Sequence, residues 1–438
     1  MEKHVVGISR YTAPYDSIKE VVDLAGGLSR IPKTAKVFIK PNIVFWSKSA
    51  IFPKWGVITT SRVVADVVKL LVEYGLKDIT IGEGTVVLDP KDKETQEDAY
   101  RRLGYRSLEK QYGIKCISVF DRPFEKVDLD AGLSLNFNTD ILNSDLVIDL
   151  PVLKTHAQTV VSLGIKNLKG TIDINSRKKC HNVDGNRDLH FYVSKLSQKF
   201  PKILTVIDGI YSNERGPAFD GKARRTNLLI ASWDVLSADL VGATILGHSP
   251  EKVPHLVHSA NHYSRPMDLS DIDVRGLALE SVVSFHNHTF PYTEDNSLPL
   301  SMAKMGIAGL TYPKYDSTLC TYCSVLTGAV LTSIAMSWKG SPWPDVEVLT
   351  GKLMKPTPGK RSVLIGKCLF EANKGNPDLK DAIFVKTCPP DPKKIIEAFS
   401  QSGVEINPDI LMNLDKFPAA FMKKYANKPE FDESFYQI

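Results

Sequence analysis

The chain has 438 residues, of which 43% are hydrophobic and 24% charged, a composition typical of a soluble enzyme with large buried cores. This length predicts two domains or more. The 55 basic and 50 acidic residues give a net charge of +5, which favours a small anionic ligand or an acidic protein partner over nucleic acid, because a nucleic-acid surface needs clustered basic residues.

The first 290 residues alternate strand and helix patterns. Residues 1–8 predict a first strand and lack the apolar stretch of a signal peptide. An apolar run at 37–39 predicts a second strand, and apolar residues at helical spacing predict a helix over 60–74, closed by Gly75. The same rhythm continues with predicted strands at 78–84, 145–150, 203–209 and 228–232 and a predicted helix at 235–246. Apolar strands separated by helices predict an α/β fold with a mostly parallel sheet and helices on both faces.

Polar residues follow several of these predicted strands. They are Lys40, Asn42, Glu83, Lys154, His156 and Asp208. In parallel sheets, ligands bind beyond the carboxyl ends of the strands. We therefore predict that Lys40, Asn42, Glu83 and Asp208 bind a substrate in one pocket. The alternative is a solvated rim, since loops are polar in any case.

The loops between residues 151 and 181 hold the densest group of reactive side chains. Lysines beside glycines can bind a carboxylate or phosphate, and a histidine can carry protons near neutral pH. We predict catalytic roles for Lys154, His156 and His181, and binding of a small anionic substrate by Lys166 and Asn167. The alternatives are exposed solubilising lysines and structural, hydrogen-bonded histidines.

The strand and helix rhythm stops between residues 269 and 315, which predicts a connection. Beyond it lies a second α/β pattern, with predicted strands at 362–366 and 382–385 and a helix at 392–400. We therefore expect a substrate-binding domain over 1–290 and a cysteine-bearing domain over 291–438. The apolar stretch at 325–336 is too short to span a membrane, and the tail at 417–438 has no assignment.

Four of the six cysteines gather in the last third of the chain. Cys320 and Cys323 form a C-x2-C pair, and Cys368 and Cys388 follow, with Cys388 in a Cys-Pro-Pro run. Four thiolates suit a [4Fe-4S] cluster, because each iron takes one sulfur ligand. Zinc ribbons use two tight pairs, whereas Cys368 and Cys388 lie far apart in the sequence and do not form a second one. A zinc site and unligated cysteines stay open as alternatives. The cysteine usage fits a reducing, cytoplasmic location.

Several motifs together resemble one known family. They are Lys40-Pro41-Asn42, Pro151-x2-Lys154-Thr155-His156, Gly164-x-Lys166-Asn167-x2-Gly170, Asp208-Gly209 with Gly216-Pro217, and Ser232-x-Asp234-x4-Asp239 with Gly242. The set resembles the domain of unknown function 362 family over roughly residues 1–260. The resemblance implies an iron-sulfur protein of two parts, whose activity the family does not define. A fainter resemblance, of residues 162–166 to the Ser-Gly-Gly-x-Lys loop of the lactate racemase family, is only half a match, and we expect no nickel.

Three functions follow from these features. The first is an oxidoreductase that passes electrons from a [4Fe-4S] cluster to a small anionic substrate, with a ferredoxin-like protein as electron donor. The second is a lyase or isomerase that removes a proton beside a carboxylate and keeps the cluster for structure. The third is an electron-transfer or assembly protein. No G-x-G-x-x-G follows a strand, so a Rossmann-type site for a nicotinamide or flavin cofactor is not predicted. We expect no nucleic-acid or membrane partner, and a homo-oligomer stays open.

Overall fold

The computed structural model describes residues 3–87, 92–129, 132–200, 202–379 and 381–438. The chain divides into two compact units. Unit 1 comprises Met1–Arg177, His190–Thr289 and Phe421–Ile438, and unit 2 comprises Lys178–Leu189 and Phe290–Ala420. A division near residue 290 is therefore present. Two segments differ from the expected boundaries, because residues 178–189 pack with unit 2 and residues 421–438 with unit 1.

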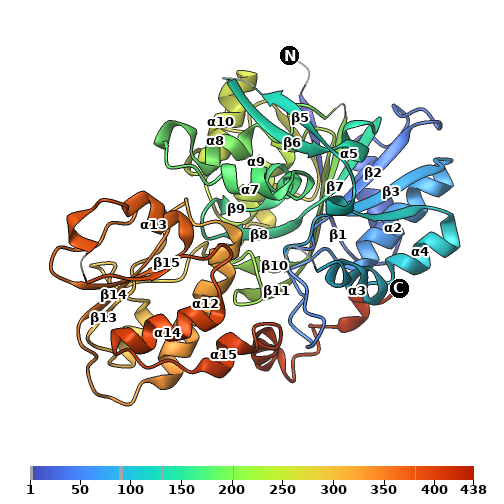
Figure 1. Ribbon diagram of the computed structural model, residues 1–438. Helices are drawn as coiled ribbons and strands as arrows, with labels where there is room; N and C mark the ends of the chain where they lie inside the picture. The colour runs from blue at the N-terminus through green and yellow to red at the C-terminus, as the bar shows by residue number, and fades with distance from the viewer. Residues whose placement is uncertain (1–2, 88–91, 130–131, 201, 380) are drawn as a thin grey trace. The chain divides into compact units, whose positions relative to one another are not determined.

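Unit 1 is built on a ten-stranded sheet whose main path runs β12-β1-β11-β10-β7-β2-β3-β4 (Figure 1). Only β11 runs antiparallel to its neighbours on this path, while β8 pairs in parallel with β10 and antiparallel with β9. The predicted fold class, a mostly parallel α/β sheet, is confirmed. The strands are β1 (His4–Arg10), β2 (Lys36–Pro41), β3 (Asp78–Glu83), β4 (Lys115–Ser118), β7 (Leu146–Leu150), β8 (Val152–His156), β9 (Val160–Val161), β10 (Ile203–Glu214), β11 (Lys222–Ser232) and β12 (Ile272–Gly276).

Helices cover both faces of this sheet. Helix α1 packs on β1 and β11 and contacts α2, whereas α9 packs on β1, β10 and β11 and contacts α6 and α10. A separate hairpin joins β5 (Phe124–Leu129) to β6 (Leu133–Asn138). The helices are α1 (Asp16–Leu24), α2 (Ser61–Tyr74), α3 (Glu94–Arg102), α4 (Tyr105–Tyr112), α5 (Thr139–Leu142), α6 (Leu163–Asn167), α7 (Ile174–Lys179), α8 (Leu189–Ser194), α9 (Val235–Ile245) and α10 (Pro254–Tyr263).

Helix α2 shows why the local sequence predicts its elements well. The Thr60 side chain accepts a hydrogen bond from the Val63 amide, which satisfies a donor at the start of the helix. Gly75 ends the helix with φ of 107°. Four of its valines and Leu71 are buried between these caps: Val63, Val64, Val67 and Val68. The predicted helix is therefore confirmed within one residue.

The segment predicted as a connection contains a strand of the main sheet. Strand β12, Ile272–Gly276, pairs in parallel with β1 at the edge of the sheet. It is short and only partly buried, and it lacks the continuous apolar run of a central strand. The same segment also holds α11 (Leu300–Lys304) of unit 2.

Unit 2 contains a four-stranded, all-parallel sheet in the order β13-β14-β15-β16, drawn in orange and red in Figure 1. Strands β15 and β16 match the predicted strands, and α14 matches the predicted helix. Helix α12 was not predicted. The remaining elements are β13 (Leu310–Thr311), α12 (Thr321–Ser337), β14 (Val346–Thr350), β15 (Arg361–Ile365), α13 (Lys367–Asn373), β16 (Ile383–Val385), α14 (Pro392–Ser402) and α15 (Pro408–Met412).

Within the part of the chain that the structure describes, no helix combines the length and apolar character needed to cross a membrane.

The C-terminal tail, residues 421–438, packs on unit 1 through its aromatic residues. The Phe431 ring stacks on Tyr211 with centroids 5.9 Å apart, and it also contacts the ring of Trp55. Tyr436 is 1% exposed and donates a hydrogen bond of 2.9 Å to the Lys54 carbonyl. The tail is thus part of the core of unit 1.

Candidate functional site

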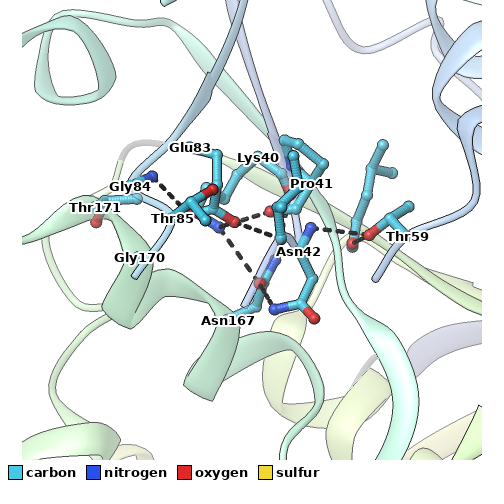
Figure 2. Close-up of polar contacts among 12 residues, drawn as sticks. Lys40, Pro41, Asn42, Thr59, Glu83, Gly84, Thr85, Asn167, Gly170 and Thr171 are labelled. Carbon is cyan, nitrogen blue, oxygen red and sulfur yellow. Dashed lines mark hydrogen bonds and ion pairs between the residues drawn. The ribbon is translucent and has the colours of Figure 1, made fainter. Parts of the chain in front are cut away.

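A buried ion pair lies at the carboxyl ends of β2 and β3. Nζ of Lys40 is 2.7 Å from Oε2 of Glu83, and the two side chains are 1% and 3% exposed. Glu83 also accepts hydrogen bonds from the backbone amides of Ile43 and Gly84. Figure 2 shows how these side chains converge. Lys40 and Glu83, both predicted as substrate-binding, are therefore each other's partners.

Two asparagines extend this pair into a longer network. The Asn167 carbonyl oxygen lies 3.4 Å from Nζ of Lys40 and accepts a 3.1 Å hydrogen bond from Nδ2 of Asn42 (Figure 2). Oδ1 of Asn42 accepts a 2.6 Å hydrogen bond from Nζ of Lys154. Five residues predicted from separate motifs are thus joined by side-chain contacts within unit 1.

Both buried lysines direct their hydrogens at protein oxygens. Nζ of Lys40 bonds to Glu83, Asn167 and the Pro41 carbonyl. Nζ of Lys154 bonds to Asn42 and to the carbonyls of Val57 and Pro217. An ammonium group has three donors, so each lysine has an acceptor for every hydrogen. This geometry favours an organising role, in which the lysines hold the loops beyond the strands.

Burial makes the charged form of both lysines less favourable. It lowers the pKa of Lys40, an effect that the attraction of Glu83 opposes. It lowers the pKa of Lys154 to about 7, again against the attraction of Glu83. The three oxygen acceptors of each lysine favour the ammonium form. The network therefore balances the cost of burying charge against complete hydrogen bonding.

Gly170 shows how tightly the network is enclosed. A Cβ atom at this position would lie 2.5 Å from Oε1 of Glu83 and 2.7 Å from Nζ of Lys40. Any larger residue would therefore displace the ion pair. The spacing from Lys166 to Gly170 in the family-like motif thus has a packing reason.

Two buried aspartates belong to the same region and were not predicted as site residues. Oδ1 of Asp149 accepts a 2.8 Å hydrogen bond from Asn167, and burial raises the pKa of Asp149 to about 7. Asp239 accepts hydrogen bonds from the amides of Gly164 and Ile165, and burial raises its pKa as well. The family-like motif around Asp234 and Asp239 was the sequence signal that could have indicated the second of these.

Asp208 anchors the start of α2. Its carboxylate accepts hydrogen bonds of 2.7 Å from the Thr60 amide and 3.0 Å from the Ile210 amide, and the side chain is buried. Burial raises the pKa of Asp208 to about 6. Its contacts are those of a residue that joins β10 to α2.

This pKa predicts how the stability of unit 1 depends on pH. Asp208 binds a proton more tightly in the folded chain than in the unfolded chain, where a carboxyl titrates near about 3.9. The free energy of unfolding should therefore fall by about 2–3 kcal/mol as pH rises from about 4 to about 6. Denaturation across this range measures it. In Asp208→Asn the fall should be smaller. The fall that remains is due to the other buried aspartates, including Asp149 and Asp239, whose pKa values are raised in the same direction. An identical slope in both proteins would contradict the assignment.

His156 and Lys166 form a pair on the loop after β8. Nζ of Lys166 is 3.0 Å from Nε2 of His156, while Nδ1 of His156 accepts a 3.1 Å hydrogen bond from the Gln158 amide. Nε2 is thus the ring nitrogen directed at Lys166. Backbone strain accompanies the pair, because Val160 and Leu163 in the connecting segment have φ of 64° and 53°. The side chains of His156 and Lys166 are therefore close enough to contact one ligand.

His181 belongs to the other unit. Its Nδ1 lies 2.9 Å from the Ser317 carbonyl oxygen, and its own carbonyl accepts a hydrogen bond from Lys352. The three residues predicted as catalytic are therefore divided between the units: Lys154 and His156 lie in unit 1, and His181 in unit 2. Although residues 178–189 follow unit 1 directly in the sequence, they pack with unit 2, and the sequence alone does not indicate this.

The four clustered cysteines follow three strands of the parallel sheet in unit 2, of which β15 and β16 are neighbours. Cys320 and Cys323 lie at the start of α12 after β13, Cys368 lies in α13 after β15, and Cys388 follows β16. Cys323 is hydrogen-bonded to Cys320, and Cys368 and Cys388 lie close enough to act on its charge. Together with burial, these neighbours raise the pKa of the Cys323 thiol.

The surroundings of these thiols fit a sulfur-ligated group. Gly366 adopts φ of 114°, and a Cβ there would lie 3.5 Å from Sγ of Cys323, so the backbone approaches the thiol closely. Cys368 and Cys388 are exposed, and all four thiols are free of disulfides. Among the described residues, no three or more His, Cys, Asp or Glu side chains are arranged to hold one metal ion. A [4Fe-4S] cluster distributes its four thiolates over four irons, and it stays a prediction here.

The fold and site define a protein of two α/β units, one with a buried lysine network and one with a cysteine group. Residues 37–244 match the model of the family described as Domain of unknown function (DUF362). The family predicted from the motifs is thereby confirmed for this part of the chain.

One relative and one solved structure extend the comparison. The thylakoid-associated protein sll1697 of Synechocystis sp. is 27% identical over 242 residues, which are 54% of this chain and 71% of that protein. The lactate racemase apoprotein from Thermoanaerobacterium thermosaccharolyticum aligns over 97% of this chain and 81% of its own, with 12% identity and a TM-score of 0.38. A likeness at that TM-score carries no argument about fold or activity.

Proposed function

We propose that this protein is an iron-sulfur oxidoreductase that transfers electrons to a small anionic substrate. The observation that carries the proposal is the position of Cys320, Cys323, Cys368 and Cys388 after three strands of one parallel sheet. The carboxyl ends of parallel strands lie at the same edge of a sheet, so four soft sulfur ligands from distant parts of the chain converge there. When bound, a [4Fe-4S] cluster would supply single electrons.

The residues of unit 1 supply the proposed binding and proton functions. Lys166 contributes a cationic side chain for an anionic group, and His156, at 3.0 Å, contributes a group that exchanges protons near neutral pH. The network of Lys40, Asn167 and Lys154 holds the loops that carry this pair. His181, in unit 2, is proposed to position the segment next to Lys352.

Purification without oxygen, followed by iron analysis and electron paramagnetic resonance, tests this proposal. We expect about four irons per chain, a brown colour and a signal on reduction. Cys388→Ser should lose iron and lower the melting temperature of unit 2, because metal binding stabilises the fold that holds it. Cys116→Ser, which changes a buried cysteine of unit 1, is the matched control and should keep its iron. A colourless protein with stoichiometric zinc would refute the proposal.

One observation favours a second candidate, a lyase or isomerase. Two basic side chains in contact, His156 and Lys166, suit removal of a proton beside a carboxylate. Exchange of a substrate hydrogen with deuterated solvent, in the absence of any reductant, would indicate this function. Substrate reduction that depends on an electron donor would indicate the oxidoreductase.

A further inference from the structure

The edge of unit 2 that carries the cysteines also carries exposed lysines. Lys352 follows β14, the exposed Lys367 immediately precedes Cys368 after β15, and the exposed Lys386 is separated from Cys388 by Thr387 after β16. Because β14, β15 and β16 are parallel, these three positions lie at the same edge of the sheet. We call Lys352, Lys355, Lys367 and Lys386 the lysine face.

The net charge of the whole chain comes from the segment that holds this face. Residues 351–388 contain eight lysines and arginines and three acidic residues, a net charge of +5. The chain as a whole has a net charge of +5. The basic and acidic residues outside this segment are therefore equal in number and have no net charge. Lys360 and Arg361 lie at the start of β15 and so at the other edge of the sheet, whereas the lysine face supplies four positive charges at the edge with the cysteines. Clustered positive charge is a feature of docking surfaces for acidic partners.

Local contacts hold these cations close to the thiols. Partial burial of its sulfur raises the pKa of the Cys368 thiol, although the residue as a whole is exposed. The positive charges of Lys352 and Lys178 oppose that rise, so both lysines lie within electrostatic reach of the thiol. Nζ of Lys386 lies 4.2 Å from the centre of the Phe370 ring and 5.1 Å from that of Phe384. The aromatic faces restrain this ammonium group through cation–π attraction.

The same edge exposes an apolar side chain and two thiols. Leu353, next to Lys352, is 51% exposed, and Cys368 and Cys388 are exposed as well. Small apolar contacts surrounded by charge are typical of transient interfaces, where charge guides encounter and little area is buried. A partner at this face would therefore approach the cysteine group directly.

We infer that the lysine face binds a small acidic electron-carrier protein, which delivers electrons to the group held by the four cysteines. The inference rests on the proposed function and names the partner of that same site. Complementary charge identifies the partner, because carboxylates around the redox group of such a carrier would meet lysines around the cysteines. A nucleic acid would meet the same charge and is therefore one outcome of the test.

Charge reversal on the lysine face tests this inference. Calorimetric titration of the full-length protein with an oxidised ferredoxin of strongly negative net charge, at low ionic strength, should detect binding. The double variant Lys367→Glu and Lys386→Glu should weaken it about tenfold or more. The matched control is Lys304→Glu, at an exposed lysine on α11. Helix α11 precedes β13, so Lys304 lies on the side of the strand's amino end, opposite the edge that carries the cysteines. Added salt should weaken binding by the unchanged protein more than by the double variant.

Two outcomes overturn the inference. Equal affinity of the double variant and the control would remove the lysine face as the docking surface. Preferential binding of a duplex DNA oligonucleotide over the ferredoxin, lost in the same double variant, would assign the face to nucleic acid. Binding that does not weaken with added salt would also remove the lysine face as the docking surface.

Iron analysis of the same samples separates this inference from the proposed function. Binding of an oxidised carrier does not require iron in this protein. A protein that binds the carrier but holds no iron would refute the proposed function and keep the docking surface. A protein that holds four irons, and whose affinity for the carrier is unchanged in the double variant, would support the proposed function and refute the docking surface. Iron content and circular dichroism of the double variant exclude misfolding as the cause of lost binding.

Discussion

Replacing Lys40 with methionine should lower the free energy of unfolding of unit 1 by about 3–5 kcal/mol. The reason is that Glu83 would keep a buried carboxylate without its cation, with only the amides of Ile43 and Gly84 left as donors. Hydrogen exchange of the β2 and β3 amides under mild denaturant measures this stability within unit 1.

Two further variants show whether the loss comes from the buried pair. Lys40→Met combined with Glu83→Leu should cost much less than the two single changes together, because no unpaired charge stays buried. Lys19→Met removes the exposed pair with Asp23, whose side chains are 52% and 56% exposed, and should cost less than about 0.5 kcal/mol. A similar small loss in Lys40→Met would contradict the importance of the network.

Replacing Tyr436 with alanine should lower the stability of unit 1 by about 3–5 kcal/mol, although this residue is the third from the end of the sequence. The side chain is fully enclosed, and its hydroxyl bonds to the Lys54 carbonyl. Truncation would leave a cavity beside the loop at residues 52–57. It would also remove one hydrogen bond to the Lys54 carbonyl, which keeps those from the amides of Val57 and Ile58. Urea denaturation gives the change in stability.

The same change should also loosen the lysine network. The Val57 carbonyl of that loop accepts a hydrogen bond from Lys154, so amides around Lys154 should exchange faster in Tyr436→Ala. Tyr263→Ala, at a side chain 47% exposed, is the matched control and should change stability by less than about 1 kcal/mol. Equal effects of the two changes would show that the tail is a loose appendage.

Most of the secondary structure was predictable because local signals agree with the fold. Apolar runs identify the buried strands β2, β3 and β7, and a threonine cap and a glycine stop delimit α2. Strand β12 was missed because it has only five residues and lacks the continuous apolar run of the central strands. Helix α12 was missed because its apolar residues show no preferred face.

The candidate site was predictable as a set of residues, but their contacts were not. The motifs identified Lys40, Glu83, Asn42, Asn167 and Lys154, and the structure joins them in one hydrogen-bonded network. The predicted catalytic role of Lys154 and the predicted substrate-binding role of the other four residues stay predictions. Residue type alone cannot distinguish a lysine that meets a ligand from one whose three hydrogens are bound to protein oxygens, because that depends on segments far apart in the chain.

The sequence by itself determined the fold class, the family match of residues 37–244 and the group of cysteines, because these depend on local periodicity and on fixed spacing within motifs. Tertiary structure alone decided which residues share a unit. His181 joined the cysteine unit and the C-terminal tail joined unit 1, since both are held by long-range hydrogen bonds and aromatic contacts. Such contacts depend on which surfaces meet when the chain packs, and no short stretch of sequence contains that information.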